Sequence, residues 1–134
     1  MKRDIPDLLV ENVAIAIVKE KDEHDNDVWN SYLINLKDHL IEAVIVTSTG
    51  YGEIKGETVK TSTLRHFLNE VPANSFTKIE PLLEDVLTLS NEYWLSFYEG
   101  KNILDKKYIF LPDTLNEDNF VTIPIIKKRG VMIK

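Results

Sequence analysis

The residues best equipped for acid–base or nucleophilic chemistry are the three histidines, His24, His39 and His66. They lie far apart in the sequence, so a shared metal or proton-transfer site would have to be assembled by the fold. His66 follows Ser62 and Thr63 closely, and a histidine beside a hydroxyl group is the pairing that activates a nucleophile. The strained turn that presents a catalytic serine is missing around these residues. We therefore assign no catalytic residue.

A glycine-rich segment, residues 50–56, follows an expected strand, as phosphate-binding loops do. Its spacing is Gly-x-Gly-x-x-x-Gly, which differs from the dinucleotide and kinase patterns. A dinucleotide loop also opens a helix, whose N-terminal amide groups bind the pyrophosphate, whereas residues 57–60 are of extended type. Glu53 and Glu57 would repel phosphate. We interpret the segment as a flexible turn between strands.

Oxygen ligands suited to Ca²⁺ or Mg²⁺ gather in residues 19–27, KEKDEHDND. The acidic residues there are Asp22, Glu23, Asp25 and Asp27. A calcium loop needs ligands at alternate positions, a glycine in mid-loop and a terminal bidentate glutamate, and this segment lacks that pattern. Lys19 and Lys21 partly neutralise the charge. We expect a solvated connection here, no metal site, and no cofactor elsewhere in the chain.

Aromatic residues are concentrated in residues 93–98, YWLSFY. Stacked aromatic rings can bind bases or sugars when they are exposed beside basic residues. In a strand, Tyr93 and Phe97 would share one face, and Trp94 and Tyr98 the other. We expect Phe97 in the core and predict that Trp94 with Tyr98 forms a partner surface.

Composition sets the outer limits. The 134 residues correspond to about one domain, so we expect a single domain over residues 1–134. The absence of cysteine excludes disulfides and thiol chemistry. The net charge of −6 disfavours nucleic acid as a partner, and no apolar run approaches the ~18 residues of a membrane span. Acidic residues interrupt the N-terminal region, which argues against a secretory signal. We expect a cytoplasmic protein that is not bound to a membrane.

Alternation of apolar and polar residues predicts strands through much of the chain. The central prediction is a hairpin of two long strands within residues 30–56, turning at Lys37-Asp38-His39. Asn35 lies among apolar residues and needs a partner if buried, since an unpaired buried amide costs roughly 1–3 kcal/mol. Further strands are expected at residues 13–18, 76–80, 93–98, 103–111, 120–126 and 131–133, with a hairpin turn at 99–102 and Pro124 weakening the strand that contains it.

Two segments leave helix and strand both open. Residues 61–71 carry apolar residues at helical spacing between a capping Ser62 and Pro72, but they follow a threonine-rich stretch that disfavours a helix. Residues 81–89 would suit a short helix with Pro81 at its first position. The whole pattern predicts a mainly β protein, an antiparallel β-sandwich with at most one or two short helices. Strand count alone makes an immunoglobulin-like arrangement the finer expectation, and a compact α+β domain is the alternative if both segments are helical.

Phrases spread over nearly the whole chain carry a resemblance to a known family. They are YLINL (32–36), STGYGEI (48–54), VKTSTLRHFL (59–68), EYWLSFY (92–98), KKYIFLP (106–112) and GVMIK (130–134). In them the chain resembles a small bacterial family of uncharacterised proteins of about this length, some of which carry the label phenylalanyl-tRNA synthetase alpha subunit.

That label implies features which the residues do not supply. A class II synthetase core is considerably larger, and it needs arginines on its ATP-binding strands and a glycine-arginine pair that opens a helix. The arginines here are Arg3, Arg65 and Arg129, and Arg129-Gly130 has the reverse order. The resemblance therefore transfers no site residue and no synthetase activity.

Three classes of function remain open. We favour a non-enzymatic interaction or structural module that uses an exposed sheet edge or aromatic face, as a homodimer or with another protein. The alternative is a small-ligand-binding protein with a pocket around Tyr51, to which Arg65 and His66 contribute. The third is an enzyme, which would require His66, Arg65 and carboxylates to converge in a cleft.

Overall fold

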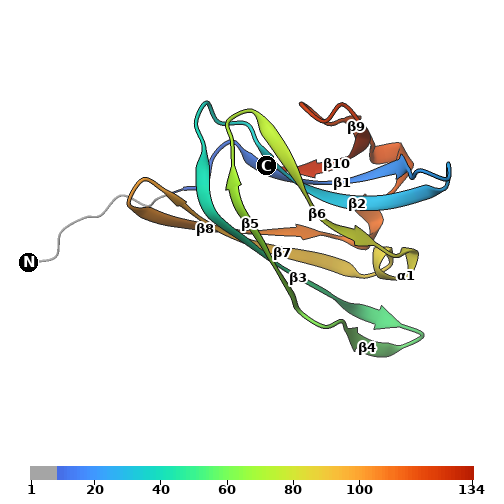
Figure 1. Ribbon diagram of the computed structural model, residues 1–134. Helices are drawn as coiled ribbons and strands as arrows, with labels where there is room; N and C mark the ends of the chain where they lie inside the picture. Colours follow the sequence, from blue (N-terminus) through green and yellow to red (C-terminus); the bar gives the residue numbers. More distant parts are fainter. Residues whose placement is uncertain (1–8) are drawn as a thin grey trace, which may run out of the picture.

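A computed structural model describes residues 9–134 as two antiparallel sheets packed face to face (Figure 1). The mainly β sandwich expected from the sequence is thereby confirmed. The N-terminal lead-in expected before the first strand lies largely outside the described residues. None of the helices formed by residues 9–134 has the length and apolar character needed to cross a membrane.

The first sheet has the order β6-β2-β1-β10-β9, and the second has the order β4-β3-β7-β8, with β5 also paired to β3. The strands of the first sheet are β1 (Val13–Lys21), β2 (Asp27–Asn35), β6 (Ser75–Leu82), β9 (Val121–Thr122) and β10 (Arg129–Ile133). Those of the second are β3 (Ile41–Ile54), β4 (Glu57–Lys60), β5 (Leu64–Val71), β7 (Ser90–Glu99) and β8 (Asn102–Phe110). The helical elements are α1 (Glu84–Leu87), η1 (Pro112–Thr114) and η2 (Glu117–Asn119).

The long strands expected within residues 30–56 are present, but the expected hairpin between them is wrong. β2 pairs with β1 and β6 in the first sheet, whereas β3 pairs with β4, β5 and β7 in the second. Residues 36–40 therefore carry the chain from one sheet to the other. The hairpin is formed by β1 and β2 instead, and residues 19–27 supply the ends of both strands as well as the turn. A short polar segment between two strands is compatible with a hairpin turn within one sheet and with a crossing between two sheets, because both kinds of connection lie in solvent.

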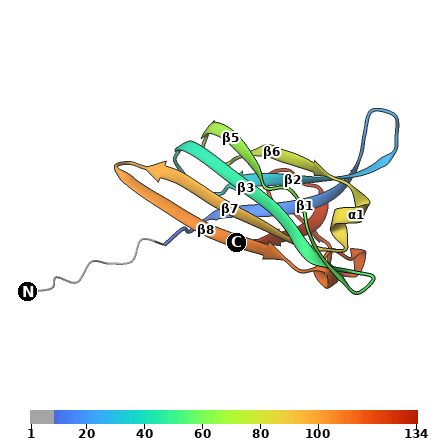
Figure 2. The same ribbon diagram turned by 90° about the horizontal axis from the view of Figure 1, so that it is seen from below.

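Six strands have the immunoglobulin-like order that strand count suggested. β1, β2 and β6 are neighbours in one sheet and β3, β7 and β8 in the other, which is the A-B-E and C-F-G order of immunoglobulin domains. β5 departs from the constant type because it pairs with β3 and not with the strand that follows it. Figure 2 shows β3, β7 and β8 side by side along one face of the sandwich.

The segment of residues 50–56 is mostly strand and not the flexible turn that its glycines suggested. β3 continues through Gly50 and Gly52 to Ile54, and Tyr51 lies opposite Lys60 of β4. The turn is confined to Lys55 and Gly56, both with positive φ (52° and 80°).

The two segments left open between helix and strand separate clearly. Residues 64–71 form strand β5, as the threonine-rich stretch before them favours, and only the four residues of α1 are helical within 81–89. The compact α+β alternative is therefore wrong. The strand expected over residues 120–126 shrinks to the two residues of β9, because Pro124 lacks the amide hydrogen that a ladder requires.

The main core lies between the sheets. Its largest fully buried side chains are Tyr93, Tyr108, Phe97 and Phe110. Tyr93 and Phe97 face inward on β7 while Trp94 and Tyr98 are exposed, as alternation predicted. A second, smaller core covers the outer face of the first sheet, where Ile123 is completely buried against β1 and β2 residues. Residues 123–126 thus shield that face, and the apolar residues on the outer face of the second sheet remain exposed.

Candidate functional site

A polar network joins the two sheets near the start of β5 and the end of β6. Glu80 of β6 is its centre, with Oε1 2.8 Å from His66 Nε2 and 2.8 Å from Ser48 Oγ. The hydroxyl of Tyr93 donates to Glu80 Oε2 at 3.2 Å. Both partners of the His66–Glu80 pair are largely buried, with side-chain exposures of 21% and 15%. One carboxylate from the first sheet therefore holds three side chains of the second.

The geometry of this network is not that of a nucleophile–base pair. In a catalytic triad the hydroxyl and the carboxylate contact different ring nitrogens of the histidine, so that the ring can pass a proton between them. Here the same nitrogen, His66 Nε2, lies 2.8 Å from Glu80 and 3.4 Å from Ser48, and the serine proton is directed to the carboxylate. Burial, reinforced by the neighbouring charge of Glu80, raises the pKa of the Tyr93 phenol, which keeps it a hydrogen-bond donor. The arrangement binds and orients groups; it does not activate the serine.

A pocket of about 230 Å³ opens beside this network, between the two sheets. Ser48, Glu80 and Tyr93 form part of its wall, and Val86 of α1 forms another part. The lining residues are Ser48, Thr49, Gly50, Thr61, Ser62, Leu64, Glu80, Pro81, Leu82, Leu83, Val86, Asn91, Glu92 and Tyr93.

The outer face of the second sheet carries a different feature, an open groove of about 540 Å³. Tyr51 and Trp94, two of the residues singled out from the sequence, both line it with Lys60, Glu92 and three threonines. The ammonium group of Lys107 lies 5.0 Å from the centre of the Trp94 ring, a cation–π contact. The structure thus brings Tyr51 and Trp94 to one surface.

Arg65 and His66, by contrast, point to opposite faces of β5. Arg65 lies opposite Thr47, whose side chain lines the outer groove, and His66 lies opposite the completely buried Val46. The expected site made of Tyr51, Arg65 and His66 is therefore not assembled as one constellation. Adjacent residues on a strand alternate between its faces, so the sequence already held the signal against this grouping.

Aromatic and aliphatic side chains continue across the outer face of the second sheet. Phe67 is 66% exposed, Trp94 44% and Tyr98 41%. Ile103 lies opposite Tyr98, and Ile109 lies opposite Glu92, on the edge strand β8. We call Phe67, Trp94, Tyr98, Ile103 and Ile109 the exposed apolar face.

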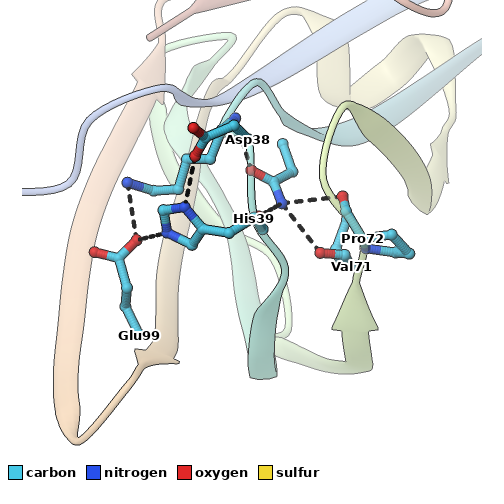
Figure 3. Close-up of polar contacts among 7 residues, drawn as sticks. Asp38, His39, Val71, Pro72 and Glu99 are labelled. Carbon is cyan, nitrogen blue, oxygen red and sulfur yellow. Dashed lines mark hydrogen bonds and ion pairs between the residues drawn. The ribbon is translucent and has the colours of Figure 1, made fainter.

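The remaining histidines lie elsewhere. His24 is in the exposed turn between β1 and β2. His39, in the crossing between the sheets, has each ring nitrogen near a carboxylate, with Nδ1 2.9 Å from Asp38 and Nε2 2.7 Å from Glu99 (Figure 3). Those two hydrogen bonds raise the pKa of His39. No group of three or more potential metal ligands forms within residues 9–134.

A second buried carboxylate, Glu20, lies on the outer face of the first sheet. Burial opposes its ionisation, but hydrogen bonds from Lys128, Tyr32 and Asn30 together lower its pKa. Through Lys128 this carboxylate fixes the chain segment that covers the first sheet. Its role is structural because its neighbours satisfy it fully.

Sequence reasoning did not identify Glu80, Ser48 or Tyr93 as site residues. Ser48 lies 32 positions and Tyr93 13 positions from Glu80 in the chain, and no spacing rule connects them. A comparison with known protein families finds none whose model matches this chain, and no curated protein matches it either.

Proposed function

We propose that this protein is a non-enzymatic interaction module whose binding surface is the exposed apolar face. The observation that carries the proposal is the asymmetry between the two outer faces. The first sheet covers its outer face with residues 123–126, among which Ile123 is fully buried. The second sheet leaves Phe67, Trp94 and Tyr98 exposed together. Large exposed apolar patches on a folded domain mark interaction surfaces.

We infer that the partner is a second copy of the chain. Charges of both signs border the apolar residues: Arg65 and Lys107 are exposed beside the glutamate and aspartate residues of the neighbouring strands. In a two-fold symmetric contact each residue of one copy meets a different residue of the other. A face with mixed charge around an apolar centre can therefore complement itself, whereas a face of one sign would repel its own copy.

Contact through the face is favoured over contact through the edge strand β8. Lys106 and Lys107 interrupt that edge, and charged side chains on an edge strand oppose open-ended strand pairing. The net charge of −6 and the absence of cysteine support a protein partner, not nucleic acid, and a cytoplasmic setting.

Small-ligand binding around Tyr51 is the second candidate, because the outer groove places Tyr51 beside Trp94. An enzyme is less well supported, since Arg65 and His66 lie on opposite faces of β5.

The test is the molar mass in solution by light scattering over a wide range of concentrations. We expect a dimer for the wild type, and a shift toward monomer for Phe67→Ser and Trp94→Ser. Truncating a central aromatic typically costs ~2 kcal/mol, and a two-fold dimer contains each residue twice, so each dissociation constant should rise roughly a thousandfold.

Phe76→Ser is the matched control, because Phe76 is a 42% exposed aromatic that packs on Tyr32 at the outer face of the first sheet. It should leave the dimer intact. A wild type that stays monomeric at the highest concentration, or equal loss of dimer in Phe76→Ser, would refute the second copy as the partner.

A further inference from the structure

We propose that the pocket between the sheets binds a small organic cation, a protonated amine that carries an apolar group. This site is separate from the exposed apolar face, because it opens on the inner side of β3. Its volume of about 230 Å³ corresponds to roughly eight water molecules at ~30 Å³ each, so its occupant is small.

The charge of the pocket selects a cation. The carboxylate on the inner wall is that of Glu80, and neither lysine nor arginine is among the residues that line the pocket. Glu92 also borders the pocket, but it shares the outer face of β7 with Trp94 and lies 3.6 Å from Lys107 Nζ. An anion placed in the pocket would face Glu80 without a lysine or arginine in the wall to offset it.

Glu80 has the capacity to accept one more hydrogen bond. A carboxylate offers about four lone-pair sites, and Ser48, His66 and Tyr93 occupy three of them. Because its side chain is only 15% exposed, water screens the remaining site weakly, and a charged donor gains more there than at the surface.

Apolar side chains line the rest of the pocket and define the body of the ligand. Leu82 is 6% exposed at the base, while Leu64 and Leu83 are 52% and 76% exposed at the rim. Val86 and Pro81 complete the apolar wall. A ligand with an amine at one end and a compact hydrocarbon at the other therefore matches both halves of the pocket.

The experiment is a titration followed by amide chemical shifts in NMR, with three probes of similar size: benzylamine, benzyl alcohol and benzoate. We expect benzylamine to shift amides of residues 48–50, 61–64, 80, 82–86 and 91–93, with benzyl alcohol at least about tenfold weaker and benzoate weaker still. Equal affinity for amine and alcohol, or shifts confined to other residues, would overturn the proposal.

Variants locate the interaction. Glu80→Gln should reduce benzylamine affinity to that of benzyl alcohol while the alcohol is unaffected. Leu64→Trp, at the solvent-exposed rim, should block both probes and does not depend on the inter-sheet network for folding. Phe67→Ser, on the opposite face of the same strand, should leave benzylamine binding unchanged even where it abolishes dimers. Undiminished benzylamine binding in both Glu80→Gln and Leu64→Trp would refute the site.

Discussion

His66 Nε2 lies 2.8 Å from Glu80 Oε1, although the two residues belong to different sheets. β5 and β6 are consecutive strands joined by residues 72–74, and the contact bridges the sandwich toward the ends of these strands that lie far from that connection. Ser48 and Tyr93 meet the same carboxylate from β3 and β7. The side chain of Glu80 thus connects its own strand, β6, to three strands of the other sheet.

Replacing Glu80 should therefore destabilise the sandwich. Glu80→Ala leaves three donors without their acceptor, and an unsatisfied buried group costs about 1–3 kcal/mol. A double-mutant cycle with His66→Ala, measured by urea unfolding, should give a coupling free energy of about 0.5–3 kcal/mol.

The control for that cycle is the pair formed by His24 and Glu23. Its atoms lie 3.5 Å apart, but both side chains are solvent-exposed, and exposed pairs contribute little. We expect a coupling close to zero there. If the two cycles gave the same coupling free energy, the contact between Glu80 and His66 would stabilise the protein no more than a solvent-exposed pair does.

Asn35 is the second residue that ties the sheets together. It is completely buried at the end of β2, and its Nδ2 donates to the carbonyl oxygens of His39, Val71 and Pro72, each at 3.0 Å (Figure 3). Its Oδ1 accepts from the backbone amide of Lys37. The side chain thus fixes both the crossing after β2 and the turn after β5.

Asn35→Ala should lower the free energy of unfolding by roughly 2–4 kcal/mol, because several buried carbonyl groups lose their donor. Asn35→Asp keeps the size but turns the donor into an acceptor that faces three carbonyl oxygens, so it should be at least as harmful. Asn102→Ala, at the exposed start of β8, is the control and should change stability by less than about 0.5 kcal/mol. An Asp variant as stable as the wild type would contradict the hydrogen-bond assignment.

Gly130 permits the close approach of β10 to β1. A Cβ atom at this position would lie 2.8 Å from the Cα atom of Val18 and would also collide with the carbonyl oxygen of Ile17. Both are backbone atoms in the middle of the first sheet and cannot move independently. Gly130→Ala should therefore cost about 1–3 kcal/mol or more, the usual effect of overpacking. Gly56→Ala has open space around it, and its cost should come from the positive φ of 80° alone.

Thermal unfolding of the two glycine variants separates these causes. At Gly56, Asn restores much of the stability lost with Ala, because Asn tolerates positive φ. At Gly130 no side chain should do so. Rescue of position 130 by a larger residue would show that β10 is free to shift away from β1.

The strands could be predicted because their alternation is local, whereas their partners could not. Alternation over residues 41–46 predicted a strand with apolar side chains on both faces, but it did not determine which sheet the strand joins, because that depends on the crossing at residues 36–40. Asn35 was recognised as needing partners, and the partners themselves come from residues 36 and 37 positions away as well as from the crossing. Pairing is a long-range property, and a single hydrophobic pattern does not encode it.

The exposed positions of Trp94 and Tyr98 followed from the same alternation. The network of Glu80 did not, because its members come from four strands with no shared spacing. Nothing in the sequence distinguishes Glu80 from the other carboxylates of this acidic chain, because its burial is a result of the fold. Local pattern therefore located the candidate surface, and only tertiary structure located the candidate pocket.

His39 makes stability depend on pH in a defined window. Hydrogen bonds to Asp38 and Glu99 raise its pKa above the ordinary value of 6.5, and the same contacts lower the pKa of both carboxyl groups. A raised histidine pKa contributes stability that is complete below about 6.5 and is lost as the pH rises through the folded-state value. Lowered carboxyl pKa values contribute stability above about 4.5 that is lost as the pH falls through their folded-state values.

The contribution of this cluster should therefore be greatest between about pH 5 and pH 6. His39→Gln should reduce the urea midpoint most in that interval and least in alkaline solution. An NMR titration of the His39 ring should show a midpoint above that of a free histidine, and Glu99→Gln should lower it because one of the two carboxylates is removed. Glu23→Gln, distant from this cluster, should leave the midpoint unchanged. A titration midpoint of His39 at or below the ordinary histidine pKa would mean that, in solution, its ring does not form hydrogen bonds with both carboxylates.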